Sequence, residues 1–216
     1  MLTMLEEVVL LAVDERTGSL CSAREFTTAY ALVGAVFFDL ALARKIDTGT
    51  ETIHVIDTAP TGNATLDRVL GEMAQRPDLT TVRQWIEQIF QHQKDLEGEA
   101  LASLIAQGIL RHEKSKLLWI IDIERFPLVE GRHQEHVKER LRRAILGDQI
   151  PDTRDIMLVS IAEPCRLLPS LLSEEELAAR RERIRLLANL ETISRKVSAA
   201  IVSLEAAMRS PMTRVV

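Results

Sequence analysis

Hydrophobic residues recur along most of this chain at intervals of three and four, the spacing that a buried helix face requires. In residues 2–13 this spacing comes with Thr3 and Glu6, which match a capping box, where each side chain bonds the other residue's backbone N–H. Similar patterns predict further helices at 65–75, 80–90, 134–146, 153–165, 173–190 and in a last segment ending near Met208. We therefore expect a mainly α-helical protein, with a short strand at 52–57.

The most apolar long segment, residues 26–46, is hydrophobic on nearly every side of the helix it predicts. Gly34 lies inside it at a cost in helix propensity, and a close helix crossing is the usual reason to keep such a glycine. The expected fold is a compact helical domain around this central buried helix. One domain over residues 1–209 would end in a frayed tail at 210–216.

The stretch 101–128 departs from the helical pattern. It begins as a helix that Gly108 ends, because glycine enters the left-handed C-cap without a steric penalty. Two apolar runs, at 109–110 and 117–123, then flank the charged sequence RHEKSK, which predicts a protruding β-hairpin with its turn at RHEKSK. A hairpin that is apolar on both faces is marginal in water and needs cover from its own domain, another subunit or a bilayer. The residues that we expect at a membrane or oligomer contact are Leu117, Leu118, Trp119 and Ile120.

Composition narrows the class of function. The formal net charge of −5 argues against general nucleic-acid binding, which normally uses a basic face. No apolar run approaches the roughly 20 residues that span a bilayer, and the first residues lack the basic start of a signal peptide. Cys21 and Cys165 show no metal or redox spacing, as expected in a reducing compartment. We expect a cytoplasmic protein that is soluble or attached peripherally to the inner membrane face.

Catalytic and metal-binding patterns are not apparent. The sequence has no GxSxG, P-loop, GxGxxG or HExxH motif, which favours a protein that is not an enzyme and holds no cofactor. His133 and His136 are three residues apart but have no third ligand nearby, so a solvated helix face is the better interpretation. Two basic clusters, 138–143 and 180–185, are either ion-paired helix faces or contacts for anionic lipid.

Several segments taken in order resemble the Golgi phosphoprotein 3 family. The matching segments are LTMLEEVVLLAVDERTG, LVGAVFFDLALARKI, DTAPTGNATLDRVL, VRQWIEQI, LIAQGILRHEK, the hairpin, the helix 137–146 and ERIRLL. The resemblance implies a predominantly helical, non-enzymatic peripheral membrane adaptor. It further implies an adaptor that in eukaryotes binds phosphatidylinositol 4-phosphate, and a hairpin that mediates oligomerisation and bilayer contact.

The resemblance also points to the positions of a lipid headgroup pocket. The family pocket uses a tryptophan and an arginine around the start of the central helix, and two arginines in the helix before GIL. The matching positions in this chain are Arg24, Val33, Lys94 and Glu97. Arg24 and Lys94 are therefore the expected lipid-binding residues, toward an anionic phospholipid surface, while Glu97 would repel phosphate.

A winged-helix DNA-binding regulator is the alternative. A helix, Gly-Ile-Leu and a hairpin bearing Arg111, His112, Lys114 and Lys116 is also how a wing looks. Its recognition helix would be 97–107, which has no Lys or Arg and is a poor surface for phosphates or guanine edges.

Overall fold

The mainly helical fold is confirmed in the computed structural model, which describes residues 2–20, 25–48, 52–117 and 121–209. The helices are α1 Met4–Ala12, α2 Glu25–Leu42, α3 Ala64–Gln75, α4 Val82–Phe90, α5 Gln93–Ala106, α6 Arg132–Leu146, α7 Thr153–Ala162, α8 Glu174–Ala188 and α9 Thr192–Arg209. A short 3-10 helix lies at Leu168–Ser170. Two antiparallel strand pairs complete the fold: β1 Ile46–Thr48 with β2 Ile53–Val55, and β3 Glu113–Leu117 with β4 Ile121–Arg125.

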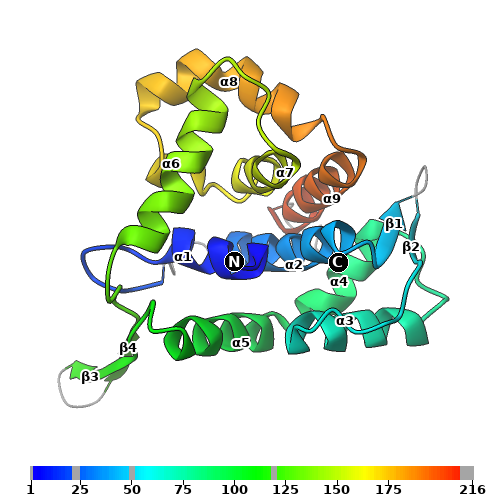
Figure 1. Ribbon diagram of the computed structural model, residues 1–216, viewed down its shortest axis with the longest axis horizontal. Helices are drawn as coiled ribbons and strands as arrows, with labels where there is room; N and C mark the ends of the chain where they lie inside the picture. The colour runs from blue at the N-terminus through cyan, green and yellow to red at the C-terminus, as the bar shows by residue number, and fades with distance from the viewer. Residues whose placement is uncertain (1, 21–24, 49–51, 118–120, 210–216) are drawn as a thin grey trace, which may run out of the picture.

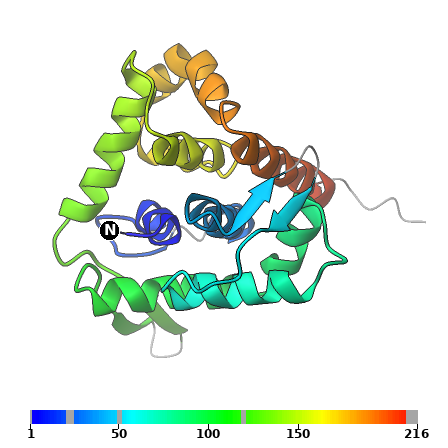
Figure 2. The same ribbon diagram turned by 45° about the vertical axis from the view of Figure 1, so that its right-hand side comes forward.

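Helices α1 and α2 form the centre of the molecule. Figure 2 shows the two helices side by side, with α3, α4 and α5 on one side and α6, α7 and α9 on the other. Every residue of α1 is buried, including Glu6 and Glu7. The sequence predicted one buried face for this helix. In the structure its polar residues are also covered by neighbouring elements.

Gly34 lies where α2 crosses two other helices, as the sequence predicted. A Cβ atom at this position would lie 3.0 Å from Ile161 Cγ2 on α7 and 3.1 Å from Val197 Cγ1 on α9. The glycine thus allows α7 and α9 to approach the central helix closely. The expected helix 26–46 is shorter in the structure, because Ile46 begins β1.

Hairpin β3–β4 projects from one corner of the helical body, between the end of α5 and the start of α6 (Figure 1). The predicted tail, 210–216, lies outside the described residues. No helix in the described part of the chain is long and apolar enough to cross a membrane.

Candidate functional site

Lys94, one of the two expected lipid-binding residues, is exposed on the surface as the second residue of α5. The segment before it is tied to the start of α2 by an aromatic stack, in which the rings of Tyr30 and Phe90 lie 4.6 Å apart. Lys94 therefore lies a few residues from a direct contact with the first turns of α2. Arg24 directly precedes α2 but lies outside the described residues, so its role stays a prediction.

The other two positions of the expected pocket supply no cation. Val33 is completely buried in the core, so a headgroup in solvent cannot reach its face of α2. Glu97 is partly buried on α5 and carries the wrong charge for a phosphate. Lys94 is thus the one cation that the described residues place at the four matched positions.

The hairpin forms, but its turn is not where the sequence analysis placed it. β3 and β4 pair from Glu113 with Arg125 to Leu117 with Ile121, so the ladder includes residues that were predicted as the turn. The sequence RHEKSK, predicted as the turn, instead leads into and forms most of β3. The predicted strand at 109–110 lies at the root of the hairpin, where Leu110 forms an isolated bridge with Leu128.

Charge pairing across the strands explains this register. Opposite charges directly across an antiparallel pair are favourable, and like charges are not. The register places opposite charges across from each other three times: Glu113 with Arg125, Lys114 with Glu124, and Lys116 with Asp122. The ammonium of Lys114 lies 3.1 Å from the Glu124 carboxylate, and this bond lowers the pKa of Glu124. The polar residues predicted as a turn therefore form one strand of a charged stem, and β4 supplies the opposite charges.

The apolar run lies at the far end of that stem. Leu117 and Ile121 form the last described pair of the ladder, and the chain between them is the continuation of the same apolar run. Leu118, Trp119 and Ile120, the other expected contact residues, lie outside the described residues.

The root of the hairpin is fixed to the helical body at Gly18. Gly18 has a φ of +67°, and its carbonyl accepts the N–H of Phe126 at 2.6 Å. A Cβ atom at this position would lie only 2.7 Å from the backbone nitrogen of Pro127. The ring of His112 stacks on that of Phe126, with centroids 5.1 Å apart. The stem is thus held by the loop after α1 as well as by its own ladder.

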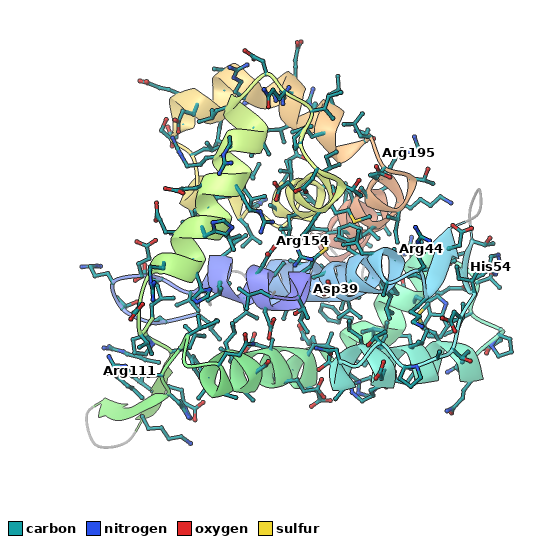
Figure 3. The ribbon with its side chains drawn as sticks, viewed as in Figure 1. Asp39, Arg44, His54, Arg111, Arg154 and Arg195 are labelled. Atoms are coloured by element: carbon teal, nitrogen blue, oxygen red, sulfur yellow. The ribbon has the colours of Figure 1, made fainter. Side chains whose placement is uncertain are left out.

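A buried polar network joins α1 to α2, α6 and α7. Arg140 on α6 donates from Nη1 to Glu7 Oε1 at 2.9 Å, and from Nε to Asp155 Oδ1 at 2.9 Å. Arg154 on α7 lies 3.4 Å from Glu7 and 3.8 Å from Asp39, measured between guanidinium nitrogens and carboxylate oxygens. Figure 3 shows Arg154 and Asp39 in the middle of the molecule, where these helices meet.

Burial sets the electrostatics of this network. Burial raises the pKa of Asp39 to about 6, although the N–H groups of Met4 and Leu5 and the charge of Arg154 act in the opposite direction. Burial also raises the pKa of Asp155, against the effect of its bond with Arg140. For Arg140, burial favours the neutral form, but the bonds with Glu7 and Asp155 outweigh it and raise the pKa.

Most arginines of the two basic clusters bond to other helices rather than point freely into solvent. Arg180 donates to the Leu146 carbonyl at 2.7 Å, and Arg183 to the Ala144 carbonyl at 3.0 Å, so both satisfy the end of α6. Arg142 bonds Glu176 at 2.7 Å, and Lys138 pairs with Glu15. These contacts favour a structural role for the clusters over contact with lipid.

Sequence reasoning missed the buried network. The sequence patterns assigned no role to Asp39 or Arg154. The available signal was an acid within a run of buried residues, as in LEEVVLL and VFFDLAL. A charge there must be paired, because an isolated buried carboxylate is very costly. Within the described residues, no group of three or more His, Cys, Asp or Glu side chains is placed to hold a metal ion.

The comparisons with known proteins agree with this architecture. The family model described as Golgi phosphoprotein 3 (GPP34) matches residues 4–204. Vacuolar protein sorting-associated protein 74 of Eremothecium gossypii is 27% identical over 207 residues, covering 80% of this chain and 62% of the relative. The chain thus spans less than two thirds of the length of that curated relative. Because the family model matches nearly the whole chain, this protein belongs to the Golgi phosphoprotein 3 family.

Proposed function

We propose that this protein is a non-enzymatic peripheral membrane adaptor that binds anionic phospholipid headgroups and self-associates through its hairpin. The observation that carries the proposal is that two apolar residues, Leu117 and Ile121, form the last described pair at the far end of a projecting stem. Its charges are matched across the strands, so the stem itself has little net attraction for either sign of charge. Apolar side chains at such a place gain most from a bilayer interface or a second copy.

The comparisons support a role at membranes. The family is named for a Golgi phosphoprotein, and the curated relative for vacuolar protein sorting. Lys94 supplies an exposed cation for the headgroup, and we assign Arg24 the same role. Since Val33 and Glu97 stand where the family places arginines, we expect a preference for anionic lipid in general rather than for one phosphoinositide.

No observation in the described part of the chain favours the DNA-binding alternative. Two polar residues at the end of its supposed recognition helix face the protein: Ser103 and Gln107 each donate to Glu6 Oε1 at 2.7 Å. The proposed partners are therefore an anionic membrane surface and a second copy of the chain, without nucleic acid.

Vesicle co-sedimentation tests the proposal. We expect the protein to sediment with anionic vesicles, less so as salt is raised, and weakly with neutral ones. Leu118→Asp with Trp119→Asp should abolish sedimentation and shift the protein toward monomer in analytical ultracentrifugation, because charges at the tip oppose burial. Lys94→Gln should weaken anionic binding about fivefold, since one basic residue near the surface contributes about 1 kcal/mol.

Ile150→Asp with Leu186→Asp is the matched control. Both side chains are exposed apolar groups away from the hairpin, at 85% and 60% exposure, so this pair adds the same charge without touching the tip. Unchanged sedimentation of the Leu118/Trp119 variant, or equal loss in the control, would rule out the hairpin as the membrane contact.

A further inference from the structure

A hollow of about 460 Å³ lies between α1, α5, α6 and α7, on the solvent side of the buried network. Its volume is in the range of small-molecule sites. None of the residues that line it belongs to β3 or β4. The charged and titratable groups that face it come from three helices and one helix cap: Glu7, His133, His136, Arg140, Asp152 and Arg154.

Arg154 is the member of this lining that has donors to spare. A guanidinium carries five N–H donors. Nη2 donates to the Leu2 carbonyl at 2.7 Å, while Nη1 comes no closer than 3.8 Å to Asp39, beyond hydrogen-bond distance. Nε is buried and also has no hydrogen-bond partner among the described residues, but it has almost no accessible surface. Nη1 is therefore the nitrogen that this guanidinium has left for a further acceptor in the hollow.

The other charged side chains of the floor are already committed. Arg140 is bonded to both Glu7 and Asp155. Glu7 is 3% exposed and faces two guanidinium groups, so its charge is matched from both sides. Asp152 accepts the N–H of Asp155 at 2.8 Å as the N-cap of α7. Asp152 is therefore not a free acceptor for Arg154, and Glu7 pairs with Nη2 of Arg154 at 3.4 Å, which leaves Nη1 for a ligand.

His133 and His136 stand on the exposed rim of the hollow, one turn apart on α6. Neither makes a hydrogen bond or an ion pair with the described residues. The lining holds two guanidinium groups and two carboxylates. The imidazole nitrogens of the two histidines are therefore available to a ligand in the hollow.

We propose that this hollow is a binding site for a phosphate group, held by Arg154 with His133 and His136. A planar guanidinium and the N–H groups of imidazole donate hydrogen bonds to oxyanions. Asp39 makes the affinity depend on pH: burial raises its pKa to about 6, and its protonation removes the negative charge beside Arg154. The site does not depend on the hairpin or on Lys94.

Isothermal titration calorimetry of the whole chain tests the site. Sulfate is the first probe, because it keeps its charge over the pH range of the test, and glycerol 3-phosphate is the second. We expect sulfate to bind more tightly near pH 5 than near pH 8, because protonation of Asp39 removes a negative charge beside Arg154. At either pH, His133→Gln with His136→Gln should weaken binding about tenfold through the loss of two donors, and Arg154→Gln should abolish binding. His54→Gln with His92→Gln, two histidines on other elements, should change nothing.

The histidine pair keeps the test independent of folding, because both side chains are exposed and bond nothing that a variant would release. Competition of sulfate with phosphatidic acid vesicles would identify a lipid headgroup as the source of the phosphate. Binding of glycerol 3-phosphate without such competition would identify a soluble phosphate ester. No sulfate binding near pH 5, an unchanged affinity in the histidine variant, or binding of sulfate alone would overturn the proposal.

Discussion

Asp39 is a buried acid whose place in the sequence, inside an apolar helix, indicates a structural role. It interrupts the most apolar helix of the chain, and the structure places it under the start of α1, where it accepts the N–H of Met4 at 2.9 Å. Such an acid supports a helix N-terminus through the dipole and the free N–H groups. Burial nevertheless favours its protonated form. Stability and pH are therefore linked at this residue.

Asp39→Asn should remove that link. The pKa of Asp39 is about 6 in the native protein against 3.8 as the ordinary value, so the native state binds a proton between these pH values that the unfolded state does not. The contribution of Asp39 to stability is fully present below about pH 3.8 and is lost as the pH rises through about 6. We expect the wild type to lose about 3 kcal/mol relative to Asp39→Asn between about pH 4 and 7.5.

Urea unfolding of both proteins across this pH range, followed by circular dichroism, measures the difference. Asparagine keeps one carbonyl acceptor for the N-terminus of α1, so the variant should fold. A difference that stays constant or grows in favour of the wild type as the pH rises would contradict a raised pKa.

At the scale of elements, helices were predictable from the sequence and the hairpin register was not. Helix faces and caps are local signals: Thr3, predicted as a cap, closes α1 through a capping box with Glu6. The turn of the hairpin was misplaced because RHEKSK is polar, and polar residues between apolar runs usually mark a turn. The partners that make it a strand, such as Glu124 for Lys114, lie ten residues on and cannot be paired without the register.

The same limit applies to the candidate sites. His133 and His136 could be singled out as a pair from their spacing, but Arg154 reaches the same hollow from another helix. Val33 could be matched to a family position, but the sequence did not show that its side chain is completely covered. Contacts between distant segments depend on packing, which no local pattern encodes.

Gly18 and Gly108 test how the hairpin is fixed to the body. Both have a positive φ, +67° and +70°, so alanine costs about 1–2 kcal/mol at either position. Only Gly18 is crowded, with the Pro127 nitrogen 2.7 Å from an added Cβ, while Gly108 has open space. We expect Gly18→Ala to destabilise the protein by about 1–3 kcal/mol more than Gly108→Ala, as measured by urea unfolding. Equal losses of stability in the two variants would mean that the backbone around Pro127 moves at little cost to make room for the added methyl group.

For the molecule as a whole, the buried polar network determines which helices pack together, which the apolar core alone does not. The apolar faces of α1 and α2 would accept several arrangements of covering helices. Arg140 selects one of them, since its guanidinium must reach Glu7 on α1 and Asp155 on α7 together. Truncating one partner of a buried ion pair is costly, because the remaining charge has no compensation.

Arg140→Gln should therefore destabilise the protein by about 3–5 kcal/mol in urea unfolding at neutral pH. Arg83→Gln is the matched control: Arg83 pairs with Glu87 at 3.1 Å, but both side chains are about half exposed, so its loss should cost less than about 1 kcal/mol. Adding Glu7→Gln to Arg140→Gln should restore part of the stability, because it removes a carboxylate that is 3% exposed and has lost its main partner. Two results would contradict this: an equal loss of stability in the Arg140 and Arg83 variants, or a double variant in which the full cost of Glu7→Gln adds to that of Arg140→Gln. Either result would mean that the network does not act as a buried charge pair. The apolar core alone would then set the arrangement of the helices.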